Sequence, residues 1–256
     1  RASPGWYYDS AGVLTEAAIN APRFDHDPDS KVPLGLRLED ERTNVFLNSA
    51  APVTQDITLT AQAYSVSMRG AGSITLSGAN TGVATEAAPL IIALASAGLT
   101  TFTVTGATFG QVEWAAASND ASAPSTSIVT QGVPVTRDAD LCFTNDVSWY
   151  NPVTGTFYAE MIRNIQETGR VIWQVSDGSN NNRWGFETSS TQRANLALRE
   201  NATNTILTSS NDTFPLGATA KMASAIGNLD LEHYLNGLRV LTGRQTAGVP
   251  IGVNLL

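Results

Sequence analysis

Alternation of apolar and polar residues with a period of two is the feature that most constrains how this chain can fold. In residues 61–70, Tyr64, Val66 and Met68 fall on one face, and polar residues stand between them. Successive side chains of a β-strand point to opposite faces, so such a segment predicts a strand with one face on a core. The segments of this kind in the first half of the chain are 61–70, 73–78 and 99–114, the last with two strands.

The second half of the chain repeats this pattern between regularly spaced turns. Asn236-Gly237 lies between two alternating runs, and the dipeptide favours a tight hairpin because both turn positions take a positive φ. Residues 177–182 predict a second hairpin turn. The predicted strands are 155–163, 169–178, 182–188, 193–200, 218–227 and 231–243. Such spacing predicts an all-β protein of antiparallel, jelly-roll-like β-sandwiches, in which a helical turn is expected at most at residues 15–20.

Prolines, glycines and polar stretches divide the chain into three predicted regions. Residues 1–49 have little periodicity and several prolines and glycines, which indicates an extended N-terminal arm. The polar segment 117–140 is the clearest boundary, and it separates two sandwich domains in tandem. The predicted divisions are an arm at 1–49, a small β-sandwich at 50–136 and a second β-sandwich at 137–256.

Charge and cysteine content exclude several classes of protein. Only 15% of the 256 residues are charged, and the formal net charge is −8. An acidic surface repels phosphate groups, so neither nucleic acid nor an anionic membrane is expected as a partner. The longest apolar run, 88–99, is shorter than the roughly 20 residues that span a bilayer. Cys142 is the single cysteine, which forbids an intrachain disulfide and favours assembly in a reducing cytoplasm.

Charged residues near the N-terminus offer a possible metal site and a structural alternative. Asp25, His26 and Asp27 are adjacent, but neighbouring residues of an extended segment point apart, and Asp27-Pro28 favours a turn. We therefore predict a structural turn here, with no metal and no cofactor. A second cluster begins at Glu39 and continues to residue 42, and we predict local ion pairs with Arg37 or Arg42.

No catalytic residues are predicted. Asp230 and Glu232 share one face of a predicted strand, as the paired carboxylates of a glycanase would. However, Tyr234 and Asn236 stand where further acids of such an enzyme are needed, so a solvent-facing stripe is the favoured interpretation. The chain is expected to be a binding or structural protein and not an enzyme.

Sugar binding has better candidate residues. Lectin-type sites place aromatic rings against sugar faces, with amide and carboxylate groups for the hydroxyls. Trp149 and Tyr150 lie in a predicted loop beside three such polar residues, and filling of the sandwich core remains an open alternative for both rings. The predicted carbohydrate-binding residues are Trp149, Tyr150, Asn151, Asn145 and Asp146.

Other aromatic and acidic residues of the second domain have mainly structural interpretations. Trp173, between apolar neighbours in a predicted strand, is expected in the core, whereas Trp184, in the next strand, is considered for both the core and sugar binding. Asp146 and Asp177 are possible calcium ligands, but no oxygen-rich group of residues supports a calcium site.

Specific strings in residues 1–49 carry a family resemblance. This segment resembles the N-terminal module of the head spike fiber family, virion proteins of tailed phages that also occur in gene transfer agents. "AQAYSVSMRGAGSITLSG" (61–78) is similar to their carbohydrate-binding-module-like sandwich, and "SWYNPVTGTFYAEM" (148–161) to a concanavalin- or laminin-G-like one. The matching N-terminal strings are Arg1–Ser3, Asp9–Val13, Pro22–Pro28, Leu34–Leu36 and Arg42–Asn44.

The resemblance implies a virion spike or tail fibre that attaches to the host surface. The expected partners are host cell-surface polysaccharide and other virion proteins at a capsid vertex or tail, and the expected location is the virion. A homo-oligomer, in this family a trimer, is also implied. The chain stops at residues 248–256 where the lectin-like sandwich would continue, so we expect this domain to be incomplete at its C-terminus.

Overall fold

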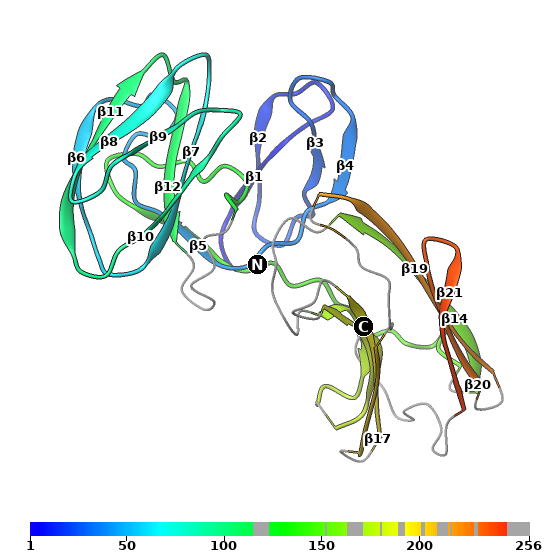
Figure 1. Cartoon of the computed structure of the whole chain (residues 1–256). Helices are drawn as coiled ribbons and strands as arrows, with labels where there is room; N and C mark the ends of the chain where they lie inside the picture. The colour runs from blue at the N-terminus through cyan, green and yellow to red at the C-terminus, as the bar shows by residue number, and fades with distance from the viewer. Residues whose placement is uncertain are drawn as a thin grey trace. The chain divides into compact units, whose positions relative to one another are not determined.

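The computed structural model describes residues 1–114, 123–151, 153–162, 171–179, 181–188, 193–200, 203–208, 215, 217–227 and 230–244. Every regular element in this part of the chain is a β-strand, and all sheets are antiparallel, which confirms the all-β prediction (Figure 1). The chain divides into two compact units, an N-terminal unit of Arg1–Leu141 and a C-terminal unit of Cys142–Leu256. Residues 245–256, on which the expectation of an incomplete second sandwich depends, lie outside the described residues.

Two short hairpins begin the N-terminal unit (Figure 1). β1 (Gly5–Tyr8) pairs with β2 (Leu14–Ala17), and β3 (Phe24–His26) pairs with β4 (Pro33–Leu36). Asp9 closes the first hairpin, because its Oδ1 accepts 2.9 Å hydrogen bonds from the backbone N–H groups of the turn. The helical turn considered for residues 15–20 does not form, since pairing with β1 extends the first part of that segment as β2.

A β-sandwich forms the rest of the N-terminal unit. One sheet has the order β10 (Leu90–Ala93), β7 (Ala63–Arg69), β12 (Phe109–Trp114), β5 (Arg42–Asn44) and β13 (Val135–Arg137). The other has the order β6 (Gln55–Leu59), β11 (Gly98–Thr105), β8 (Ser73–Gly78) and β9 (Gly82–Ala84).

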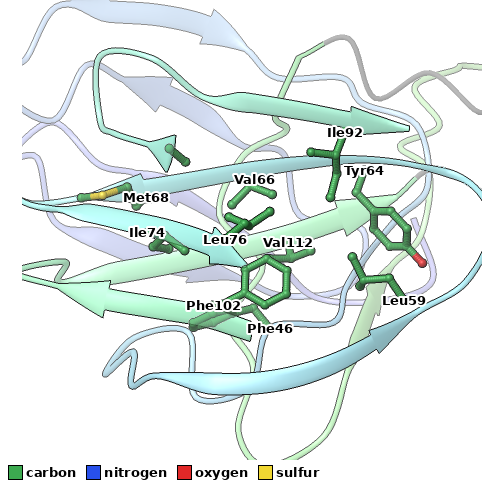
Figure 2. Close-up of a cluster of buried hydrophobic side chains, with 11 residues drawn as sticks. Phe46, Leu59, Tyr64, Val66, Met68, Ile74, Leu76, Ile92, Phe102 and Val112 are labelled. Carbon is green, nitrogen blue, oxygen red and sulfur yellow. The ribbon is translucent and has the colours of Figure 1, made fainter. Parts of the chain in front are cut away.

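The core lies between these two sheets, as Figure 2 shows. Tyr64, Val66 and Met68 project from β7 into it, as their alternation predicts. Phe46 and Phe102 meet edge to face, with ring centroids 6.1 Å apart, and both are fully buried. Burying an aromatic ring of this size stabilises a fold by about 1.5–3 kcal/mol, so these two rings contribute strongly.

The predicted boundary at residue 49 does not coincide with a division of the structure. β5, from the predicted arm, pairs with β12 and β13 inside the five-stranded sheet. Phe46, also from the arm, is fully buried in the sandwich core. The division between the compact units follows Leu141, five residues after the predicted one at 136, because Asp140 is tied to the arm by ion pairs.

Those ion pairs belong to a buried network that fastens the N-terminus. Glu39 forms an ion pair with Arg23 at 2.9 Å and a second ion pair with Arg137. Asp140 pairs with Arg1 at 3.2 Å and also with Arg23. The guanidinium groups of Arg23 and Arg137 are almost completely buried. Burial would raise the pKa of Glu39, but the surrounding arginines outweigh it and lower this pKa from 4.5 to about 2.

The local ion pairs predicted for the charged cluster form only in part. Arg42 Nε does donate to Asp40 at 3.2 Å, as a local pair. The partners of Glu39 that the structure records as ion pairs are instead Arg23 and Arg137, both distant in sequence. Sequence spacing identifies neighbours along a strand, but not residues that folding brings together.

Asp25 and Asp27 serve the second hairpin in different ways. Asp27 Oδ1 accepts hydrogen bonds from the backbone N–H of Ser30 at 2.7 Å and from its hydroxyl at 2.8 Å, which confirms the predicted turn. Asp25 is buried and pairs with Arg37 at 2.7 Å. Among the described residues, no three His, Cys, Asp or Glu side chains are grouped to hold a metal ion.

The C-terminal unit is a second β-sandwich. One sheet has the order β14 (Thr154–Ile162), β19 (Thr219–Gly227), β20 (Asp230–Leu235) and β21 (Leu238–Arg244). The other has the order β15 (Val171–Ser176), β16 (Arg183–Thr188), β17 (Ala194–Glu200) and β18 (Thr203–Thr208). Inward residues of both sheets, among them Trp184, Leu196 and Met222, form one core. The predicted hairpin joins β20 to β21, with Asn236 and Gly237 at φ values of 51° and 84°.

Candidate functional site

The predicted sugar-binding residues all lie in the loop that precedes β14, which we call the 145–151 loop. Asp146 shapes its first half, because its Oδ1 accepts hydrogen bonds from the backbone N–H of Ser148 at 3.1 Å and from its hydroxyl at 2.7 Å. These two bonds lower the pKa of Asp146 below its usual value, so the carboxylate is charged at neutral pH. Asn151 shapes the other end, where its Oδ1 accepts a 2.8 Å bond from the N–H of Val153.

Trp149 is the aromatic side chain that this loop presents to solvent. Half of its surface is exposed, an uncommon condition for a large aromatic residue. Its indole N–H donates to the carbonyl of Asp146 at 2.9 Å, which fixes the orientation of the ring. A ring that is held in place loses little conformational freedom when a flat ligand packs against it.

A series of aromatic contacts connects Trp149 to the sandwich core. Its ring packs against Phe157 of β14, with centroids 5.6 Å apart. Phe157 in turn stacks on Trp173 at 4.1 Å and meets Trp184 edge to face at 4.7 Å. Trp184 is fully buried and Trp173 packs against the same core. The core position expected for Trp173 is therefore confirmed, and the open question for Trp184 is resolved in favour of the core.

Tyr150 has a different role from its neighbour. It is half-buried, packs against the core of the C-terminal unit, and meets Trp149 edge to face with centroids 6.2 Å apart. Burial raises the pKa of its hydroxyl, so the group stays protonated at neutral pH. Tyr150 thus supports the exposed ring more than it offers a surface of its own.

The polar residues of the loop differ in how much hydrogen-bonding capacity remains open. Asn145 is exposed, and no hydrogen bond of its amide is found within the described part of the chain. Asp146 Oδ2 likewise accepts no hydrogen bond there. Asn151 uses its oxygen within the loop, and its amide N–H lies 3.4 Å from Thr154 Oγ1. An exposed ring beside an amide and a carboxylate can stack on a sugar face and bind its hydroxyls.

A second aromatic surface, which sequence reasoning missed, lies on the solvent face of β14, β19 and β20. Tyr158 and Tyr234 both stand opposite Ala223 of the intervening strand, so only a small side chain separates their positions. Tyr158 is 61% exposed, and its hydroxyl donates to Glu160 at 3.1 Å. The period-two pattern could have placed these tyrosines on one face, but strand order was needed to show that they are neighbours.

Asp230 and Glu232, which the sequence offers as a possible catalytic pair, lie on this same face. Tyr234 donates to Glu232 at 2.7 Å and Arg239 pairs with it at 3.2 Å, and these contacts lower the pKa of Glu232. Asp230 is exposed, at the start of the strand. Asp177, weighed as a calcium ligand, accepts bonds from the N–H of Ser179 at 2.8 Å and from the amide of Asn182 at 2.7 Å, within its own turn.

Comparison of the chain with models of known protein families, with curated proteins and with solved structures finds no match. Within the described residues, no helix is long and apolar enough to cross a membrane.

Proposed function

We propose that this chain is a structural virion protein, a spike or fibre of a tailed phage or gene transfer agent, that binds polysaccharide on the host cell surface. It acts by binding and does not cleave the polymer. The resemblance of residues 1–49 to head spike fiber proteins motivates the virion assignment. The proposed binding surface is the 145–151 loop of the C-terminal unit. The proposed assembly is a homo-oligomer, with three copies as in the family it resembles.

The observation that carries the proposal is the half-exposed Trp149, held against Phe157 and by its bond to the Asp146 carbonyl. Contact of an aromatic ring with a sugar face is favoured when the ring is already oriented, because less entropy is lost on binding. Asn145 and the free oxygen of Asp146 lie in the same short loop and can take up hydroxyl groups. These features support binding without a catalytic pair.

Affinity electrophoresis tests this proposal with purified bacterial surface polysaccharides cast into the gel. Trp149→Ala should abolish the retardation that the wild-type protein shows, with the C-terminal unit still folded. The matched control is Val153→Ala, another exposed position near the loop, which should leave retardation intact. Equal retardation of Trp149→Ala and wild type would contradict the proposed site.

A second candidate function is that of a structural adaptor, which joins other fibres to the capsid or tail. The observation that favours it is an apolar surface on the second hairpin of the N-terminal unit. Phe24 and Leu36 are cross-strand partners in β3 and β4, and are 58% and 42% exposed. Leu34, from the same strand, is also exposed. Exposed apolar clusters of this kind often mark protein interfaces.

Substitution on this surface separates the two functions. Phe24→Ser with Leu36→Ser should leave the buried network and the fold intact, because both side chains are exposed. Loss of the double variant from assembled particles, with polysaccharide binding unchanged, would show that the hairpin attaches the protein to the virion. A depolymerase, the third possibility, would be recognised by shortening of the polymer.

A further inference from the structure

The N-terminal unit contains a groove of about 350 Å³ that the proposed function does not use. It lies between the first hairpin and the segment that leads into β13. Its volume falls at the lower end of the range of ligand-binding pockets, about 300–1,000 Å³, which suits a small ligand or one unit of a polymer. The residues that line it and matter for the argument are Trp6, Glu16, Ser127, Gln131, Val133 and Arg137.

Trp6 and Glu16 form the first hairpin's side of the groove. They are cross-strand partners in β1 and β2, so their side chains leave the same face of the hairpin. Trp6 is half-buried and Glu16 is exposed. Within the described residues, the Glu16 carboxylate has no ion pair and accepts no hydrogen bond, and the indole N–H of Trp6 has no acceptor. An aromatic ring thus stands directly beside an open carboxylate.

The opposite side of the groove adds two open polar side chains. Ser127 and Gln131 both line it, and neither side chain has a hydrogen-bond partner within the described part of the chain. By contrast, the hydroxyl of Thr136 lies 2.8 Å from Thr43 Oγ1 and is already used. The groove therefore combines one ring with donors and acceptors that a ligand can satisfy.

The charges around the groove select the class of ligand. Among the described residues that line it, Arg137 is the cation, and its guanidinium is buried, paired with Glu39 and bonded to the Asp40 carbonyl at 2.9 Å. Glu16 is the exposed charge, and it is negative. Phosphates, sulfates and acidic sugars would meet a carboxylate without a free cation, so the groove disfavours them.

We infer that this groove binds one neutral sugar unit, with the ring of Trp6 against the sugar face and Glu16 accepting hydrogen bonds from its hydroxyls. Gln131 and Ser127 bind the remaining hydroxyls from the other side. The inference rests on the proposed function for its biological role, as a second glycan contact, but its chemistry depends only on the groove.

The indole N–H resonance of Trp6 reports on this site directly. The chain has five tryptophans, so a ¹⁵N-labelled sample gives five such signals, and Trp6→Phe identifies the relevant one. The probes are glucose, galactose, mannose and N-acetylglucosamine, titrated separately into the full chain to tens of millimolar. At least one of them should shift the Trp6 signal in a saturable way. Glu16→Ala, at an exposed position, should weaken that titration by about fivefold, as should Gln131→Ala.

Matched probes show which outcome overturns the inference. Glucuronate should leave the Trp6 signal unmoved, and so should methylammonium, a small cation that a lone carboxylate could attract. Saturable binding of methylammonium in place of the sugars, or no response to any of the four sugars, would overturn it.

Trp149→Ala distinguishes the proposed site in the 145–151 loop from the proposed site in the groove. In Trp149→Ala the Trp6 titration should persist unchanged, even though retardation by polysaccharide is lost. Failure of the loop would remove only retardation, and failure of the groove would remove only the Trp6 response, so the two proposals fail independently.

Discussion

Glu39 accepts a charge-assisted hydrogen bond from Arg137, a residue 98 positions later in the chain, in the interior of the N-terminal unit. Arg23 forms an ion pair with the same carboxylate at 2.9 Å, and Thr126 donates hydrogen bonds to it of 2.8 Å from its N–H and 2.6 Å from its hydroxyl. The Glu39 side chain thereby connects three segments of the unit. Arg23 lies just before β3, Thr126 lies in the segment after β12, and Arg137 ends β13. The N-terminal segment is consequently a built-in part of the unit and not a free arm.

Glu39→Gln should destabilise the N-terminal unit by about 3–5 kcal/mol, because the buried guanidinium groups of Arg23 and Arg137 lose one of the two carboxylates that balance their charge and only Asp140 remains. Urea unfolding followed by tryptophan fluorescence measures this change. The control is Glu86→Gln, which removes an exposed pair with Arg69 (2.8 Å) and should cost no more than about 1 kcal/mol. A loss as small for Glu39 as for Glu86 would show that the network contributes little.

Acid should destabilise the N-terminal unit through the same carboxylate. The pKa of Glu39 is about 2 in the folded unit and 4.5 as its ordinary value. A lowered carboxyl pKa gives stability that is complete above the ordinary value and is lost as the pH falls towards the folded one. The free energy of unfolding should therefore decrease between about pH 4.5 and pH 2. Glu113 opposes this in part, since burial raises its pKa.

Comparison of wild type with Glu39→Gln isolates this effect, because the contribution of Glu113 is common to both proteins. The difference in unfolding free energy between them should shrink steadily over that acidic range. A difference that is independent of pH would mean that Glu39 is not charged in the folded unit.

The C-terminal unit should respond to pH at a higher value, through His233. This side chain is fully buried, next to Phe186 at a ring distance of 4.5 Å, and burial lowers its pKa from 6.5 to about 4. The neutral ring is thus favoured by folding, and its stability contribution is complete above pH 6.5 and lost as the pH falls to about 4. The expected loss is about 3 kcal/mol.

His233→Phe provides the comparison, since a phenyl ring can occupy the same apolar surroundings but cannot take up a proton. Its unfolding free energy should change less than that of wild type between pH 6.5 and 4, measured in a Trp6→Phe, Trp114→Phe background that limits fluorescence to the C-terminal unit. Parallel pH profiles would contradict the burial of a neutral histidine.

The two aromatic residues of the 145–151 loop should separate binding from stability. Tyr150→Ala removes a half-buried ring and should lower the melting temperature by several degrees. Because the ring is partly exposed, its truncation should cost about 3 kcal/mol or less, which is below the cost of truncating a fully buried aromatic residue. Tyr150→Phe keeps that packing and should bind polysaccharide as wild type does. Weakened binding by Tyr150→Phe at unchanged stability would instead assign the hydroxyl a direct role.

Periodicity predicted much of the fold from the sequence alone. Strand β8 was placed at its observed bounds, and the Asn236-Gly237 hairpin followed from the φ values that its turn requires. Short strands such as β5 and β13 were missed, because three residues carry too little alternation to be recognised. They also depend on pairing between distant segments, which local sequence does not encode.

The candidate sites were predictable to different degrees. The sequence identified Trp149 as a loop aromatic, but only packing distinguishes it from Tyr150, its half-buried neighbour. The pairing of Trp6 with Glu16 could not be predicted, since it depends on the register of β1 and β2. The same is true of Glu39, whose partners come from both ends of the N-terminal unit.

Size-exclusion chromatography with light scattering tests the central claim most directly. The full-length protein is mixed with each of a panel of purified bacterial surface polysaccharides, and the mass of protein and polymer is followed together. We predict that the protein co-elutes with at least one polymer whose mass is unchanged, and that Trp149→Ala elutes separately. A polymer shortened by the protein would contradict binding without cleavage, and elution apart from every polymer would contradict the carbohydrate-binding function itself.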